Sequence, residues 1–326
     1  MLARMNKVRL GLASVTLLAV TGLGVAPSAV ADVTVPTEAT PAVGMAYDTV
    51  REVLWFAGPG AQQGELVSAD GDQVSISAEL VSPQALAFAD DRIWIGDIGD
   101  PNQDREFIVI YRLGANAAGR TSYQAFDFIF PDGPLNATAF MISGKGRIYL
   151  ATDGEDPGIY RAPAEPSRQS LNRLTRVADA PAGVTDGVFL DDGTTVALRT
   201  AAGIEYIDAL SWRPTVTDTL VGAPADESIA ADPNDTIFVG GNPVVRETDV
   251  PESDRQTVVG PASPEPTPTA TTEPTASASA SPSAVASPSA TPAPSGAANR
   301  VGTFTALIVA AAVALICGAV AFFYRQ

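Results

Sequence analysis

The chain repeats one short pattern five times between residues 44 and 241, and this repetition restricts the fold more than any other feature of the sequence. In each copy, a run rich in small residues leads through an acidic or glycine-containing turn into a second apolar run. The copies span residues 44–58, 85–97, 137–153, 186–200 and 228–241, with equivalent second-run positions at Trp55, Trp94, Tyr149, Ala197 and Phe238. These positions are 39, 55, 48 and 41 residues apart. A repeat of about 40–50 residues is typical of the four-stranded blade of a β-propeller.

Each copy leaves room for two further strands. Candidate third strands are Glu65–Val67, Phe107–Leu113, Gly158–Ala162, Gly203–Asp208 and Val244–Thr248. Candidate fourth strands are Gln73–Leu80, Tyr123–Phe130, Leu171–Ala178, Thr215–Val221 and Arg255–Val259. The sequence therefore predicts an all-β ectodomain over residues 32–260, a β-propeller of five four-stranded blades, with a β-sandwich or another all-β fold as the alternative. Asp32–Glu38 is a candidate to pair with the last blade and close the ring, in an edge position because of its proline.

The amino-terminal residues 1–31 have the pattern of a secretory signal peptide. Arg4, Lys7 and Arg9 precede an uncharged run from Leu10 to Val25, and Ala29-Val30-Ala31 offers a cleavage site before Asp32. An uncleaved anchor helix is the alternative. The signal peptide predicts that the propeller is extracellular.

The carboxy-terminal part has two further segments. Residues 261–300 form a predicted disordered stalk, because 32 of the 36 residues at 261–296 are Pro, Ala, Ser or Thr and cannot build an apolar core. Residues 301–324 carry no charge and are long enough for a transmembrane helix. Only residues 325–326 then remain as a cytoplasmic tail. The sequence thus predicts a single-pass protein of the cell membrane, anchored through its C-terminal helix.

Composition excludes several kinds of chemistry. The chain has no histidine, and its one cysteine, Cys317, lies in the last apolar run, so Ser-His-Asp and Cys-His catalysis, imidazole metal sites and disulfides within the chain are excluded. Residues 32–300 hold all 37 acidic residues and only 16 basic ones, a net charge of −21. Nucleic acid is therefore not an expected partner, since binding it needs clustered Lys and Arg.

Several stretches resemble a group of secreted and cell-surface actinobacterial β-propeller proteins, themselves distantly similar to phytase-like and esterase-like propellers. They are PQALAFADDRIWIGDIGD (83–100), FPDGP (130–134), GRIYLATD (146–153), VTDGVFLDDGTTVALRT (184–200) and ESIAADPNDTIFVGG (227–241). The resemblance implies carboxylates around one mouth of the central channel. This sequence departs from that pattern at Gln84, Asn136 and Thr138, which stand where the group usually has acids.

The acids that remain give a candidate metal site. Asp97, Asp100, Asp132, Asp186 and Glu227 are predicted to line a shared acidic mouth that binds calcium weakly, because calcium takes six to eight oxygen ligands. No cofactor other than calcium is indicated. The competing interpretation is that these acids are turn residues, as expected for Asp90-Asp91, Asp191-Asp192-Gly193 and Asp232–Asp235.

Three functions remain open from the sequence. The favoured hypothesis is a cell-surface binding or scaffolding module for an unidentified extracellular ligand or envelope protein. The alternative is a calcium-dependent hydrolase of phosphoesters, lactones or esters, in which a carboxylate-held metal activates water. A purely structural role in the envelope is the third. No residue is assigned as catalytic.

Overall fold

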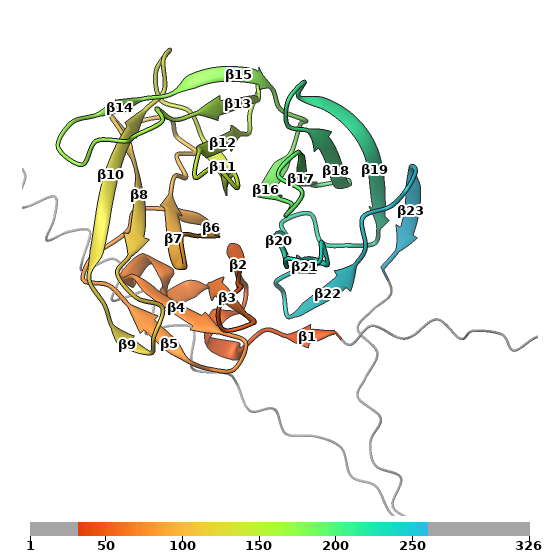
Figure 1. Ribbon diagram of the computed structural model, residues 1–326, viewed down its shortest axis with the longest axis horizontal. Coiled ribbons are helices and arrows are strands. Elements are labelled where there is room, and N and C mark those ends of the chain that lie inside the picture. The colour runs from red at the N-terminus through yellow and green to blue at the C-terminus, as the bar shows by residue number, and fades with distance from the viewer. Residues whose placement is uncertain (1–31, 260–326) are drawn as a thin grey trace, which may run out of the picture. The chain divides into compact units, whose positions relative to one another are not determined.

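The computed structural model describes residues 32–259, which form five β-sheets around a central axis (Figure 1). Each sheet is one blade, with its first strand beside the axis and its later strands further out. The predicted all-β, five-bladed propeller is confirmed. No helix within residues 32–259 is both long and apolar enough to cross a membrane. The predicted signal peptide (1–31), stalk (261–300), membrane helix (301–324) and tail (325–326) lie outside the described residues.

The strands follow the predicted repeat closely. Blade 1 contains β2 (Gly44–Asp48), β3 (Val53–Ala57), β4 (Glu65–Ser68) and β5 (Gln73–Ser75). Blade 2 contains β6 (Pro83–Ala89), β7 (Arg92–Asp97), β8 (Ile108–Leu113) and β10 (Tyr123–Ile129). Blade 3 contains β11 (Ala137–Ile142), β12 (Ile148–Thr152), β13 (Gly158–Arg161) and β15 (Thr175–Asp179). Blade 4 contains β16 (Val184–Phe189), β17 (Thr195–Thr200), β18 (Gly203–Asp208) and β19 (Arg213–Val221).

Blade 5 is completed by the amino-terminal end of the described chain. Its strands β20 (Ser228–Ala231), β21 (Ile237–Gly240) and β22 (Val244–Thr248) are joined by β1 (Val33–Thr34), which pairs antiparallel with β22. The short 3-10 helix η1 (Thr37–Ala39) then leads to β2 of blade 1. The predicted closure of the ring by Asp32–Glu38 is therefore confirmed.

One predicted strand belongs to another blade. The sequence assigns Arg255–Val259 to blade 5 as its fourth strand, and this is wrong. The strand β23 (Arg255–Val258) pairs parallel with β19 at the outer edge of blade 4. Because β1 already occupies the outer edge of blade 5, that edge is not available to β23.

Two short strands cover other outer edges in the same way. The strand β9 (Gly119–Arg120), from the connection within blade 2, pairs parallel with β5 of blade 1. The strand β14 (Asn172–Arg173), from the connection within blade 3, pairs parallel with β10 of blade 2. The predicted fourth strand at Leu171–Ala178 is therefore divided between β14 and β15. Covering outer strands satisfies backbone groups that would otherwise form exposed sheet edges.

The hydrophobic core consists of five clusters, one between each pair of neighbouring blades. Trp55, Trp94 and Phe238 are buried in three of these interfaces, as predicted from their equivalent positions in the repeats. Tyr149 is only half-buried, and its ring packs against Phe189 and Trp212. The first strands of the blades line the axis that runs between these clusters.

Candidate axial pocket

The first strands of all five blades surround a pocket of about 240 Å³ on the propeller axis. Five lining residues occupy equivalent positions in the five blades, because each pairs with the equivalent second-strand residue of the repeat. They are Ala46, Ala87, Met141, Val188 and Ala230. Three of these five are alanine. The small residues that mark the repeat in the sequence thus keep space open on the axis.

The mouth of the pocket is formed by the turns between the first and second strands. These turns contribute Thr49, Asp90, Gly144, Asp191 and Asp232, one from each blade. The sequence predicts turns at the three aspartates, and they do lie in or beside turns. A pocket at these residues was not predicted. The signal was present, because turns at the same position of every repeat come together at the same end of a propeller.

Asp186 lies beneath the opposite end of the pocket. It is fully buried, and its carboxylate accepts hydrogen bonds from the backbone N–H of Gly187 (2.8 Å) and of Ile229 (3.1 Å). The N–H of Met45 donates to it as well. These three donors belong to blades 4, 5 and 1, and all three residues line the pocket. The equivalent positions in the other blades hold Gly44, Ala85, Ala139 and Ser228. Asp186 is thus one acid in a ring of small residues, and its hydrogen bonds link the first strands of three blades.

The bonds to Asp186 also show which backbone groups face the pocket. The N–H groups of Met45, Gly187 and Ile229 point to the axis. In each of these strands, the N–H group two residues further along points in the same direction. These further N–H groups belong to Tyr47, Phe189 and Ala231, which line the pocket nearer its mouth. The pocket wall therefore combines apolar side chains with backbone donors and acceptors.

The buried position of Asp186 leads to a prediction about pH. Burial raises the pKa of this carboxyl well above its usual range, although the hydrogen bonds from Ile229, Gly187 and Met45 oppose the shift. The folded protein then holds the proton more tightly than the unfolded chain, so the stability contributed by Asp186 is full below its unfolded pKa of about 3.9 and falls as pH rises through the folded pKa. We expect Asp186→Ala to be more destabilising at pH 5 than at pH 8.

Urea unfolding of both proteins between pH 4 and 9 measures this difference. The control is Asp132→Ala in an exposed turn, which should change the free energy of unfolding by no more than about 0.5 kcal/mol. A cost of Asp186→Ala that is the same at every pH would show that the carboxyl stays ionised in the folded protein.

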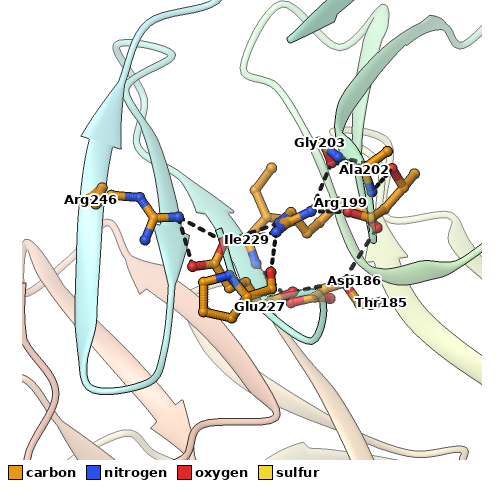
Figure 2. A network of polar contacts seen from close by, with 10 residues as sticks. Thr185, Asp186, Arg199, Ala202, Gly203, Glu227, Ile229 and Arg246 are labelled. Carbon is orange, nitrogen blue, oxygen red and sulfur yellow. Dashed lines mark hydrogen bonds and ion pairs between the residues drawn. The ribbon is translucent and has the colours of Figure 1, made fainter. Parts of the chain in front are cut away.

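Glu227 lies at the centre of a second buried polar network, between blades 4 and 5 (Figure 2). Its carboxylate accepts from Nη2 of the buried Arg199 at 2.8 Å and from Nη2 of Arg246 at 2.7 Å. Arg199 also donates to the carbonyls of Pro224 (2.6 Å) and Gly203 (3.1 Å). The hydroxyl of Thr185 donates to the Glu227 carbonyl at 2.7 Å. Glu227 is thus neutralised by two guanidinium groups from two different blades.

Two of the three remaining predicted metal ligands, Asp97 and Asp100, have partners of their own. The Asp97 carboxylate accepts hydrogen bonds from both Nη atoms of Arg105 at 3.2 Å and from the backbone N–H of Ser82 at 2.6 Å. Asp100 accepts from the backbone N–H groups of Asp104 and Arg105 in the following loop. Asp132 is exposed in a turn.

The structure therefore does not bring these five acids to one point. In the part of the chain from residue 32 to 259, no group of three or more Asp or Glu is close enough to hold a metal ion. A calcium site built from Asp97, Asp100, Asp132, Asp186 and Glu227 stays a prediction from the sequence that this arrangement does not favour. Asn136 and Thr138, which replace acids of the resembled group, also make internal bonds, to the Asp100 N–H and the Val184 carbonyl.

No protein-family model and no curated protein matches the chain. Among solved structures, the chain is similar to a streptogramin B lyase (13% identity, TM-score 0.38, covering 68% of this chain and 73% of that one). It is also similar to a gluconolactonase from Xanthomonas campestris (15% identity, TM-score 0.41, 66% and 89% covered). A nidogen/laminin complex matches at 16% identity and a TM-score of 0.41, with 61% and 71% covered. At these scores the comparisons do not assign a function.

Proposed function

We propose that this chain is a binding module displayed at the cell surface, and that a small ligand binds in the axial pocket. The observation that carries the proposal is the pocket itself, to which all five blades contribute. Concave sites that combine apolar groups with a few polar groups are where proteins bind small molecules. Its volume of about 240 Å³ lies below the usual range for drug-sized ligands, so the ligand is small.

The partners of the acidic residues support binding rather than hydrolysis. Calcium-dependent hydrolysis would need several carboxylates free to hold the metal. Asp97 and Glu227 instead form ion pairs with arginines, and Asp186 binds three backbone N–H groups. These contacts are typical of carboxylates that stabilise a fold.

Display at the surface rests on the two ends of the sequence. The proposed signal peptide precedes β1, and the proposed stalk follows β23, so the propeller would be exported and then held above the membrane by residues 301–324. Protease treatment of intact cells tests this part. The propeller should be released into the medium by cleavage within residues 261–300, and a propeller that is degraded only after lysis would contradict it.

Substitution at Gly144 tests the pocket. A Cβ added at this turn residue meets no atom within 4 Å, so there is room for a larger side chain; Gly144→Phe is designed to narrow the mouth, and Gly144→Ala is the matched control. Full-length protein, wild type and both variants, is incubated with a small-molecule extract, and the bound compounds are identified by mass spectrometry. We expect a compound that is retained by the wild type and by Gly144→Ala but not by Gly144→Phe. Identical profiles for all three proteins would overturn the proposal.

A further inference from the structure

We infer that the ligand of the axial pocket is a small organic cation, with its ammonium group at the mouth and its apolar body inside. This inference rests on the proposed function, because it concerns the same pocket. It is carried by the shape of the pocket together with the charges and side chains that line it.

The charged residues that line the pocket all have the same sign. They are Asp90, Asp191 and Asp232, and no Lys or Arg is among the lining residues. Asp90 is largely exposed, and its nearest cationic partner, Arg112, is 4.0 Å away. The turn end of the pocket is therefore acidic, and none of the acids predicted from the sequence to form an acidic mouth lines it. It favours a positively charged ligand over a neutral or an anionic one.

Two neighbouring groups report on this charge. Burial alone would raise the pKa of Asp232, but hydrogen bonds from Thr236 and Asn234 outweigh burial and lower it, so the carboxylate is ionised at neutral pH. Tyr47 also lines the pocket, and the pKa of its phenol is raised by burial and then by the negative charges of Asp232 and Glu52.

The inner part of the pocket suits an apolar body. Below the mouth, the walls are formed by Ala46, Ala87, Met141, Val188 and Ala230. Tyr47, Phe88 and Phe189 also line the pocket, and the ring of Tyr47 stacks on Phe238 while that of Phe189 packs against Tyr149. A small amine with a short alkyl chain has this combination of a cationic head and an apolar tail.

The position of the three carboxylates separates an organic cation from a metal ion. They come from blades 2, 4 and 5, so they surround the mouth instead of meeting at one point. An ammonium group contacts such a rim through one or two carboxylates and fills the remaining space with its alkyl chain. The same chemistry is offered by a free alkylamine and by the lysine side chain of a partner protein.

The experiment compares ligands of one size and three charges. Binding of n-butylammonium, n-butanol and butyrate to the full-length protein is measured by saturation-transfer NMR, and the peptide acetyl-Gly-Lys-Gly-amide represents the protein-borne amine. The variants are Asp90→Asn/Asp191→Asn, Gly144→Phe and, as a control, Asp70→Asn in an exposed turn outside the pocket.

We expect n-butylammonium to bind the wild type and Asp70→Asn equally, and butyrate not to bind. The double variant should bind at least tenfold more weakly, a loss of about 1.4 kcal/mol, and Gly144→Phe should not bind. Binding of the peptide at similar affinity would assign the amine to a partner protein, and much weaker binding would assign it to a free amine.

Three results would overturn the inference. Binding of butanol or butyrate that is as tight as that of the amine, and is lost in Gly144→Phe, would refute the cationic ligand but leave the pocket as a binding site. Amine binding that the double variant leaves unchanged would refute the role of the carboxylates. Displacement of the amine by millimolar CaCl₂ but not by NaCl of equal ionic strength would assign the mouth to a metal ion.

Discussion

Replacing Glu227 with glutamine is expected to lower the free energy of unfolding by about 3–5 kcal/mol, because it removes the carboxylate from a buried ion pair. Arg199 is completely buried, and Glu227 is the one carboxylate with which it forms an ion pair in residues 32–259. The glutamine variant would leave that guanidinium charge uncompensated in the interface between blades 4 and 5. For a domain of this size the loss corresponds to a fall of roughly 10 °C in melting temperature.

Two further variants separate charge from packing. Glu252→Gln, at an exposed position, should change the stability by no more than about 0.5 kcal/mol. The double variant Arg199→Met/Glu227→Leu removes the fully buried ion pair and should be more stable than Glu227→Gln alone, because the only guanidinium in residues 32–259 that then loses its partner is that of Arg246, whose side chain is 22% exposed. Urea unfolding followed by circular dichroism measures all three. If Glu227→Gln were as stable as Glu252→Gln, the network would not stabilise the junction between the two blades.

The blades could be predicted from the sequence because each one is encoded locally. Two strands joined by a short turn leave a repeated pattern, such as the run from Ala85 to Asp97, and that pattern fixes which residues pair. Burial of the equivalent aromatic residues Trp55, Trp94 and Phe238 follows from the same periodicity.

Pairing between blades could not be predicted in this way. Strands β14 and β23 each pair with a blade other than the one to which the sequence assigns them, and β9 was not predicted as a strand. A strand at the outer edge of a sheet has no local signal for its partner, because several edges compete for it. The assignment of Arg255–Val259 to blade 5 failed for this reason, since β1 takes that edge.

The acidic residues could be found in the sequence, but their partners could not. Asp97 and Arg105 are eight residues apart, and Glu227 is separated from Arg199 by 28 residues. Proximity along the chain gives no indication of such pairs, so free carboxylates and neutralised ones look alike in a sequence. The pocket aspartates were recognised as turn residues because a turn is local, whereas their convergence depends on closing the ring.

Ring closure itself leads to the other large expected effect, which concerns Val35. The chain just after β1 is held to blade 5 by a hydrogen bond from the Val35 N–H to the Pro243 carbonyl at 2.8 Å, and the Val35 side chain is 3% exposed in the core between blades 5 and 1. Val35→Asp removes about 2 kcal/mol of apolar burial and adds a carboxylate without a partner in that core. We therefore expect the free energy of unfolding to fall by more than about 4 kcal/mol.

The neighbouring Thr34 is exposed, so Thr34→Asp makes the same change in charge without burying it and should lower the free energy of unfolding by no more than about 0.5 kcal/mol. Urea unfolding and limited proteolysis of the two variants measure the difference, and the Val35 variant should be cleaved in blades 5 and 1 before the other blades. Equal stability of the two variants would show that the ring holds without its amino-terminal strand, in which case the four remaining interfaces between blades are sufficient to maintain the pocket.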